Sequence, residues 1–394
     1  MNNVVHLVRW CLPHTASFIR NQIIYHQRYR PSVVYTQPKK GNFYEDIHAK
    51  AETLFPLRSS FDRKLYGFTK LLSPAAKILI REFIKRQKPD VLHIHYGVDC
   101  LVYADIIREL QIPACVSFYG YDCTTFPKRF LGVGKLLLQK RVFDNPSVKA
   151  VFAMSDDMKR DLIKIGCPEE KLIVHYYGIE TDPFFMDRSI AANEVIKFLM
   201  VSGLHEKKGH QYLIEAFANL SHTLHNKCEL HIVGDGPLYV SIKDGVAKSN
   251  LTNIFLHAAV TYGSPEHKAY LRDADIFVHP SITSHDGDKE GIPGALIEAM
   301  AAGLPVISSF HAGIPSVVEN EITGLLVPEK DAKALEAAML RLATDTVLRA
   351  RIGRQGQQYA LEQLDVSFKE KELEEIYDLI SKTKKSINTV GDFS

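Results

Sequence analysis

The sequence predicts an α/β protein made of parallel β-sheets covered by helices. Short apolar runs typical of buried strands alternate with helical stretches in the first half of the chain, and the same alternation returns in the second half. With 394 residues, the chain is long enough for two domains, each with its own core. Its 46% hydrophobic and 24% charged residues are typical of a globular protein. We therefore expect two domains, each built on a parallel sheet.

In the first half, an apolar strand and a helical pattern over Ser17–Tyr29 open the chain. This opening lacks the G-x-G-x-x-G fingerprint of a dinucleotide site, which counts against a dehydrogenase. Ligands of such sheets bind beyond the carboxyl ends of the strands. The predicted strands are Val4–Val8, Ser32–Thr36, Asp90–Tyr96, Ala114–Phe118, Lys149–Met154 and Leu172–Tyr176.

A linker near Asp187–Glu194 leads into the second half, where the same alternation continues. The polar tail from Lys382 onward has no periodicity, so we expect it to be disordered. The predicted strands are Lys197–Val201, Leu230–Gly236, Asn253–His257, Ala274–Pro280 and one that begins at Pro305. The predicted helices are Gln211–Leu220, Asp331–Ala343 and Phe368–Ser381.

The two halves carry opposite charge. Residues 1–150 hold 23 Lys and Arg against 11 Asp and Glu, a net charge of +12, so the remaining 244 residues carry 25 against 35, or −10. Much of the basic excess lies in the stretches Arg58–Lys88 and Lys128–Arg141. These are either solvated helix faces or a surface for anionic lipid headgroups or a phosphorylated acceptor. Nucleic acid is the least favoured partner for this surface, because the sequence has no recognisable nucleic-acid-binding motif.

The cysteines and the N-terminus indicate a cytosolic protein. The six cysteines form no C-x-x-C pair or metal-like spacing, so we expect reduced core residues. Arg9 interrupts what would have to be the apolar region of a signal peptide. The uncharged run over Ala299–Val318 contains two prolines and two glycines, which suit a strand-loop region better than a membrane span.

The stretch Glu290–Ser309 carries the chemistry. Pro293 suits a first helical turn and Gly303 a stop, so a helix is expected over Pro293–Ala302. The face that carries Glu298 is otherwise made of small residues. A helix rise of 1.5 Å per residue places Glu290 and Glu298 about 10 Å apart. Amide N–H groups at the helix start lie between them and favour an anion, for which a diphosphate is the natural candidate.

This stretch resembles the donor-site signature of retaining glycosyltransferases of family 4. The pattern is E-x(7)-E followed by A-G-L-P-V-I, and the likeness continues through Gly313–Pro315 and Gly324–Pro328. The resemblance implies the GT-B fold, in which two Rossmann-like doubly wound domains face an interdomain cleft. It also implies that Glu290 contacts the donor sugar and that Glu298 holds the nucleotide ribose. The donor-site stretch between them comprises Gly291, Ile292, Pro293 and Gly294.

The resemblance also suggests domain bounds. We expect an acceptor-binding domain over 1–190, a nucleotide-sugar domain over 191–365, a helix over 366–385 that crosses back to the first domain, and a disordered tail over 386–394.

The loop Ser202–Gly209 is a candidate phosphate clamp, since lysines sit beside glycine at a strand-to-helix turn. It resembles the family's G-R-L-x-E-K-K-G, which implies that Lys208 binds the donor diphosphate. The family's arginine is replaced by Gly203, which removes a contact worth roughly 1.5–3 kcal/mol. Lys207 or a residue of the first domain is a candidate to compensate. The resemblance places residues beside His257 near the nucleobase.

The acceptor side is predicted from weaker likenesses. Tyr119-Gly120-Tyr121-Asp122 resembles the family's H-G-x-D, with Tyr119 in place of histidine. A phenol with an ordinary pKa near 10 can position an acceptor but is a poor base, and a packed strand-end tyrosine is the alternative. Ser17 lies in a loop that resembles S-E-T-F-I, and His95 belongs to an H-x-H-x-G stretch.

We expect no required metal. His93 and His95 share one face of a strand, but two histidines without a third are more often structural. The D-x-D string at Asp286–Asp288 could hold a divalent cation on a diphosphate, but triplets this short are common by chance. Lys208 and the helix N-terminus can neutralise the diphosphate in place of that cation. No cofactor is expected beside a nucleotide diphosphate sugar as donor.

The resemblance therefore implies a retaining glycosyltransferase of bacterial surface polysaccharide synthesis. Its donor would be UDP- or GDP-linked, its acceptor a lipid-linked glycan, and its place the cytoplasm, with peripheral contact to the inner face of an anionic membrane. The alternatives are a nucleotide-sugar epimerase or phosphorylase of the same fold, or a donor-binding protein without catalysis. Fold analogy does not choose the sugar, base or linkage.

Overall fold

The computed structural model describes residues 1–9, 17–36, 44–129, 131–188, 194–225 and 227–388. The chain divides into two compact units. The first contains Met1–Gly178 together with Val366–Ser394, and the second contains Ile179–Asp365.

Within the described residues, the first unit is built on a seven-stranded sheet of order β3-β2-β1-β4-β5-β6-β7. Every pairing in it is parallel, as the alternation of strands and helices predicts. The strands are β1 Asn2–Val8, β2 Tyr29–Tyr35, β3 Glu52–Leu54, β4 Val91–His95, β5 Ala114–Ser117, β6 Val148–Ala153 and β7 Leu172–Val174.

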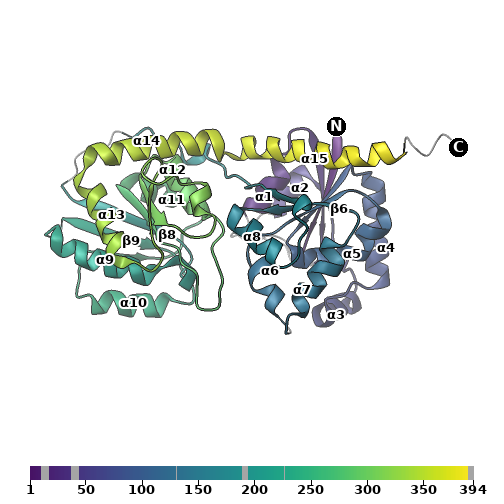
Figure 1. Cartoon of the computed structure of the whole chain (residues 1–394), viewed down its shortest axis with the longest axis horizontal. Coiled ribbons are helices and arrows are strands. Elements are labelled where there is room, and N and C mark those ends of the chain that lie inside the picture. Colours follow the sequence, from purple (N-terminus) through teal and green to yellow (C-terminus); the bar gives the residue numbers. More distant parts are fainter. Residues whose placement is uncertain (10–16, 37–43, 130, 189–193, 226, 389–394) are drawn as a thin grey trace. The chain divides into compact units, whose positions relative to one another are not determined.

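Helices cover both faces of this sheet, with α1 and α15 over one face and α4 and α5 over the other (Figure 1). The apolar side chains between these layers form a large buried cluster, and a smaller one lies around α1 and α2. The helices are α1 Ser17–Ile24, α2 Tyr44–Lys50, α3 Ser60–Thr69, α4 Pro74–Gln87, α5 Gly97–Leu110, α6 Tyr121–Thr124, α7 Val133–Leu138, α8 Asp156–Lys164 and α15 Val366–Asn388.

The carboxylate of Glu374 on α15 ends the helical pattern that begins at Ser17. Its Oε1 accepts the backbone N–H groups of Gln27, Arg28 and Tyr29 at 2.8, 2.8 and 3.1 Å. Because these amides are taken by a residue more than 300 positions away, helix α1 stops at Ile24. The prediction of a helix up to Tyr29 is wrong for this reason.

Helix α15 belongs to the first unit, although it follows the second unit in sequence. It continues to Asn388 and so includes Lys382 and residue 386, from which sequence analysis expects a disordered tail. The segment is polar, but lysine is a good helix former. Residues 389–394 of the predicted tail lie outside the described residues.

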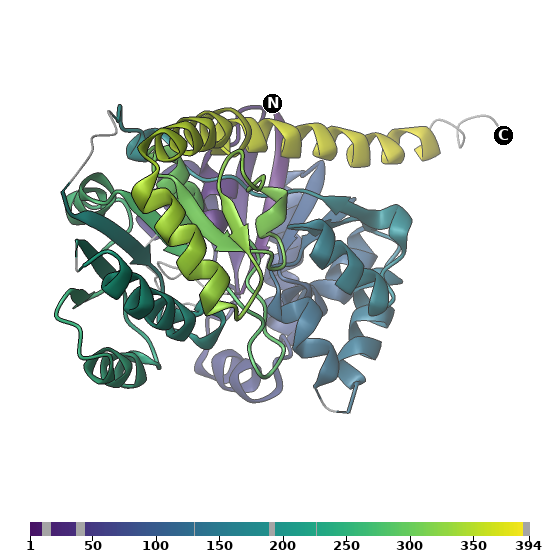
Figure 2. The same ribbon diagram turned by 60° about the vertical axis from the view of Figure 1, so that its left-hand side comes forward.

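Within its described residues, the second unit holds a six-stranded parallel sheet of order β10-β9-β8-β11-β12-β13. Figures 1 and 2 show α9 and α13 on one face of this sheet and α12 and α14 on the other. The strands are β8 Ile196–Val201, β9 Cys228–Val233, β10 Ile254–His257, β11 Ile276–His279, β12 Val306–Ser309 and β13 Leu325–Val327. The helices are α9 His210–Thr223, α10 Tyr239–Lys248, α11 Pro265–Asp273, α12 Gly294–Ala301, α13 Ala332–Thr344 and α14 Thr346–Gln363.

The second unit begins at Ile179, earlier than position 191. Thr181 donates from its backbone and its hydroxyl to Asp365 at 3.2 and 2.6 Å, which ties both ends of the unit together. Arg188 donates to the carbonyl oxygens of Ala302 and Ala274 at 2.7 and 2.8 Å. Contacts within the second unit therefore already begin before the linker predicted near Asp187–Glu194, part of which lies outside the described residues.

The cysteines that the structure describes are buried and free, as the sequence predicts. They are Cys100, Cys115, Cys123, Cys167 and Cys228. Cys11 lies outside the described residues. Over the part of the chain that the structure covers, no helix is long and apolar enough to cross a membrane.

Candidate functional site

Lys208 and Glu290 meet in the second unit as an ion pair. Lys208 ends a short 3-10 helix, Glu206–Lys208, in the loop after β8, and Glu290 lies in the loop before α12. The Lys208 Nζ and Glu290 Oε2 atoms are 2.5 Å apart, and both side chains are about 15% exposed. The structure thus brings together the two residues that the sequence singles out as catalytic.

The loop that carries Lys208 is fixed by backbone contacts. Gly209 has φ +73°, and a Cβ atom there would lie 2.0 Å from the carbonyl oxygen of Pro280, so a side chain is excluded. The N–H of Ile282 donates to the carbonyl oxygen of Lys207 at 2.9 Å. The loops after β8 and β11 therefore hold each other, which positions the Lys208 side chain.

The Glu290 carboxyl is held in its charged form. Burial alone would raise its pKa, but the charges of Lys208 and then Lys207 lower the pKa to about 2. The N–H of Glu290 donates to Nε2 of His311 at 2.9 Å, so Nδ1 of His311 carries the proton and donates to Glu329 at 2.7 Å. Sequence analysis missed His311 and Glu329, because no local pattern marks a residue that braces a loop.

Glu298 lies in α12 and has the opposite electrostatic state. Its side chain is buried, and burial raises its pKa to about 8. A Cβ atom on Gly294 would lie 3.5 Å from Glu298 Oε1, an ordinary van der Waals contact, so the first turn of α12 lies directly beside this carboxyl. Nε2 of His267 lies 3.5 Å from Glu298 Oε2, and burial lowers the pKa of His267 to about 4. Helix α12 begins at Gly294 with Pro293 as N-cap, within one residue of the prediction.

The other predicted donor residues are spread around this pair. Lys207 Nζ pairs with Asp288 Oδ2 at 3.0 Å. A Cβ atom on Gly203 would lie 3.2 Å from the ring of His205 and 3.9 Å from the nearest backbone atom, the Asp235 carbonyl oxygen. The backbone packing therefore does not require a glycine at this position. Gly291 and Ile292 lie in the loop between Glu290 and α12, and a Cβ on Gly291 would meet open space.

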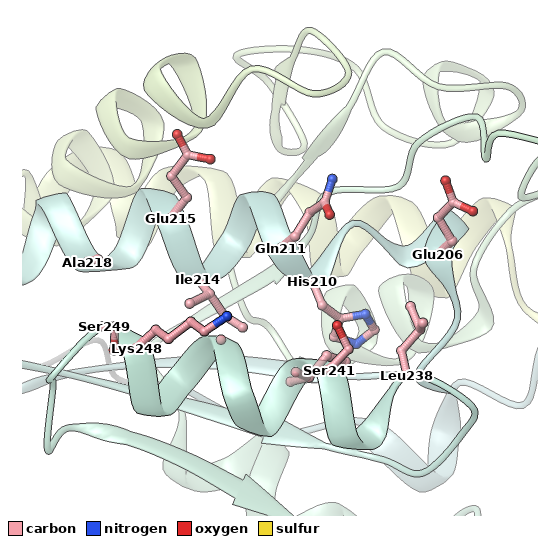
Figure 3. A pocket seen from close by; sticks show the side chains of 12 residues that line it. Glu206, His210, Gln211, Ile214, Glu215, Ala218, Leu238, Ser241, Lys248 and Ser249 are labelled. Atoms are coloured by element: carbon pink, nitrogen blue, oxygen red, sulfur yellow. The ribbon is translucent and has the colours of Figure 1, made fainter.

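His257 lies apart from the ion pair, at the end of β10. Its ring stacks on His231 and contacts Tyr270 of α11, and the three side chains line a cavity of about 150 Å³. Figure 3 shows a larger cavity of about 320 Å³ between α9 and α10, lined by Glu206 and His210 among others. Its lining contains none of the predicted donor residues.

In the first unit, the predicted acceptor-side residues lie at the carboxyl ends of β4 and β5. Asp122 braces the turn at Tyr119 and Gly120: its Oδ1 accepts their N–H groups at 3.0 and 3.2 Å, and its Oδ2 accepts the N–H of Gly97 at 2.8 Å. Burial raises the pKa of Asp122 to about 6 even though these amides lower it. Asp122 therefore supports the backbone. Ser17 begins α1, and its side chain lies outside the described residues.

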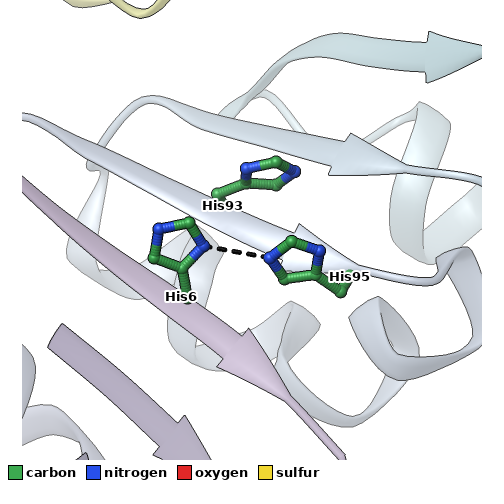
Figure 4. A group of neighbouring side chains, drawn as sticks. All are labelled: His6, His93 and His95. Carbon is green, nitrogen blue, oxygen red and sulfur yellow. Dashed lines mark hydrogen bonds between the residues drawn. The ribbon is translucent and has the colours of Figure 1, made fainter. Parts of the chain in front are cut away.

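A third histidine joins the two that the sequence places on one strand face. The register of β1 against β4 sets His6 opposite His93, and ring nitrogens of His6, His93 and His95 lie within 4.8 Å of one another (Figure 4). Sequence analysis missed His6 because 87 residues separate it from His93. Each of the three rings is buried.

Comparison with known proteins gives two family matches. Residues 25–183 match the model described as glycosyltransferase family 4, and residues 183–359 match glycosyl transferases group 1. The chain is 36% identical over 294 residues to the amylovoran biosynthesis glycosyltransferase AmsK of Erwinia amylovora, covering 72% of this chain and 68% of that protein. It is 40% identical over 195 residues to WcaL of Escherichia coli, named "putative colanic acid biosynthesis glycosyltransferase", and that match spans about half of each chain (49% and 48%).

Solved structures share the fold. The Anabaena protein Alr3699/HepE in complex with UDP has a TM-score of 0.77 at 18% identity and covers 96% of this chain and all of that chain. A sucrose-phosphate synthase from Thermosynechococcus elongatus has a TM-score of 0.75 at 16% identity, covering 97% of this chain and all of that one. The fold is GT-B, and the chain belongs to the glycosyltransferases of family 4.

Proposed function

We propose that this glycosyltransferase moves a sugar from a nucleotide diphosphate sugar to a glycan acceptor in bacterial surface polysaccharide synthesis, with retention of anomeric configuration. The observation that carries the proposal is the partly buried Lys208–Glu290 pair beside the start of α12. A cation and a helix N-terminus together favour a diphosphate. The names of AmsK and WcaL support an exopolysaccharide, and the UDP complex of HepE supports a UDP-linked donor.

In the proposed reaction, the leaving diphosphate takes negative charge as the glycosidic bond stretches. Lys208 and the amides at Gly291–Gly294 stabilise that charge. The acceptor hydroxyl attacks from the same face and loses its proton to the departing phosphate, so no covalent intermediate is needed. Glu290 holds the sugar and Glu298 the ribose. Because Lys208 and the helix start meet the diphosphate charge, the proposal requires no metal.

The acceptor is proposed to be a lipid-linked glycan at an anionic membrane. Helix α3 of the first unit and its flanks combine basic and apolar side chains: Phe68 is 93% and Leu71 65% exposed, beside exposed Lys64 and Lys70. Large apolar side chains among lysines are typical of a surface that rests on anionic headgroups.

Replacing Lys208 tests the donor site. Calorimetric titration with UDP, GDP and ADP should show one preferred nucleotide, with the same affinity with and without Mg²⁺. Lys208→Ala should bind it roughly 10- to 100-fold more weakly, since a charge-assisted contact is worth about 1.5–3 kcal/mol. Lys243→Ala removes an exposed lysine of α10 and serves as the control. Absence of binding by all three nucleotides would refute the donor site.

Glu290→Gln should strengthen nucleotide binding while it weakens transfer. Removing the carboxylate leaves Lys208 without its counter-ion, so UDP affinity should rise by about 1 kcal/mol, roughly fivefold. Transfer of labelled sugar from the donor to lipid extracted from membranes of an exopolysaccharide-producing bacterium should fall on the order of 100-fold, as on loss of a transition-state contact.

The control for this variant is Glu215→Gln, which removes an exposed carboxylate from α9. It should change neither quantity. Full transfer activity in Glu290→Gln would refute the role given to this residue.

Nucleotide binding should release a proton from Glu298. Its pKa of about 8 keeps the carboxyl mostly protonated at pH 7 in the free protein. Ribose hydroxyls donate to the charged form and lower that pKa, so the proton leaves on binding. Titrations in buffers of different ionisation enthalpy should show close to one more proton released by the native chain than by Glu298→Gln. Equal release by both proteins would contradict the ribose contact.

Substituting the apolar residues of α3 and its flank tests the membrane surface. The double variant Phe68→Ser, Leu71→Ser should bind phosphatidylglycerol-containing vesicles at least tenfold more weakly in sedimentation, since each buried apolar side chain contributes roughly 1.5–3 kcal/mol. Val347→Ser removes an 80% exposed apolar side chain of the second unit and should have no effect. Unchanged vesicle binding in the double variant would rule out α3 as the contact.

A further inference from the structure

A chain of hydrogen bonds runs through the buried histidines of the first unit. Nε2 of His26 lies 2.9 Å from Nε2 of His6, and Nδ1 of His6 lies 2.9 Å from Nε2 of His95 (Figure 4 shows the second contact). Nδ1 of His95 lies 2.8 Å from the Tyr119 hydroxyl, which donates to Gln22 Oε1 at 3.1 Å. The chain thus links the segment after α1, β1, β4, the turn after β5 and α1 itself.

The end at His26 is anchored by two carboxylates of α15. Nδ1 of His26 lies 2.7 Å from Glu370 and 3.5 Å from Glu374. Burial alone would lower the pKa of His26, but these carboxylates raise it to about 9, so both ring nitrogens carry protons at neutral pH. The other groups around His26 are His6 and the rings of Tyr29 and Tyr377.

A doubly protonated His26 sets the direction of every later bond. Its Nε2–H donates to His6, so His6 is neutral with its proton on Nδ1, and that proton is donated to His95. His95 then carries its own proton on Nδ1 and donates it to Tyr119. Because the Tyr119 oxygen accepts that N–H, its O–H is free to donate to Gln22. Burial lowers the pKa of both His6 and His95, which agrees with neutral rings.

The chain ends at the Gln22 amide. Gln22 is fully buried, and the bond from Tyr119 identifies its oxygen end. Its Nε2 group has no hydrogen-bond partner among the residues that the structure describes. Because this amide has no accessible surface, the relay ends inside the fold.

We propose that the relay His26–His6–His95–Tyr119 runs in this one direction and fixes the Tyr119 hydroxyl as a hydrogen-bond donor to Gln22 inside the fold. That Tyr119 lies on the acceptor side rests on the proposed function. Tyr119 is then a positioning residue, which holds α1 against the turn after β5 and takes no proton from the acceptor.

The same geometry opposes a metal ion at His6, His93 and His95. All six of their ring nitrogens already have hydrogen-bond partners, since His93 contacts the Tyr377 hydroxyl at 2.5 Å and the Ser117 hydroxyl at 2.7 Å. A metal would have to displace these bonds beside the His26 imidazolium.

Nitrogen NMR of the full chain with 15N-labelled histidine tests the direction of the relay. We expect two N–H nitrogens in His26, and a protonated Nδ1 with an unprotonated Nε2 in both His6 and His95. Tyr119→Phe removes the hydroxyl at the open end and should leave all three patterns unchanged. The double variant Glu370→Gln, Glu374→Gln at the anchored end should remove the His26 charge and shift the proton pattern of His6 and His95.

Glu375→Gln, an exposed carboxylate of the same helix, is the control and should change nothing. A neutral His26, a proton on Nε2 of His95, or stoichiometric zinc in the purified protein would overturn the relay.

Tyr119→Phe tests the role of Tyr119 in the lipid-extract transfer assay. Because Tyr119 takes no proton, kcat should fall less than about tenfold, with an unchanged pH profile and unchanged UDP affinity. A fall in kcat of roughly 100-fold or more, as on loss of a general base, would overturn the positioning role. Loss of transfer in the native chain would instead refute the proposed function, and the NMR pattern would still decide the relay.

Discussion

The ion pair of Lys208 and Glu290 is the constraint on which the second unit depends. Neither charge could stay buried alone, because an unpaired charge in a desolvated place is strongly destabilising. Lys208 lies in the loop after β8 and Glu290 in the loop after β11. The two loops are joined by the hydrogen bond from the Ile282 N–H to the Lys207 carbonyl oxygen. A diphosphate that replaces Glu290 as the partner of Lys208 would free the carboxylate for the donor sugar. The pair therefore keeps the Glu290 carboxylate charged at the proposed site until a donor enters.

The two glutamates of the E-x(7)-E pattern illustrate how position, more than residue type, sets chemistry. Glu290 faces Lys208 and stays ionised, whereas Glu298 faces His267 and apolar surroundings and holds its proton. Eight residues of loop and helix thus carry a charged group and a neutral group on either side of a helix start. Such a separation suits a ligand that presents an anion between two hydroxyl-bearing sugars.

Local sequence patterns predicted the strands of both sheets except β3 and β13, which are only three residues long, and they singled out Lys208, Glu290 and Glu298, because strand alternation, a proline at a helix start and a glycine-lysine loop are short-range signals. They could not predict the bracing of Glu290 by His311 or the end of α1 at Ile24. The first depends on the loop after β12, and the second on Glu374, 350 residues from α1. The position of His6 beside His95 likewise follows from the order of the strands in the sheet, which hydrophobic periodicity and composition do not predict.

Tyr119 shows why a replaced motif residue has to be judged with its neighbours. A phenol in the place of the family's histidine looks like a loss when the sequence is considered alone. In the fold, the imidazole is supplied one strand away by His95, and burial raises the pKa of Tyr119 further above its usual value. A phenol that cannot ionise is a hydrogen-bond donor of fixed direction once an imidazole N–H occupies its oxygen. The substitution therefore exchanges a possible base for a rigid donor, and the charge that fixes its direction sits on α15, which returns to the first unit from the far end of the chain.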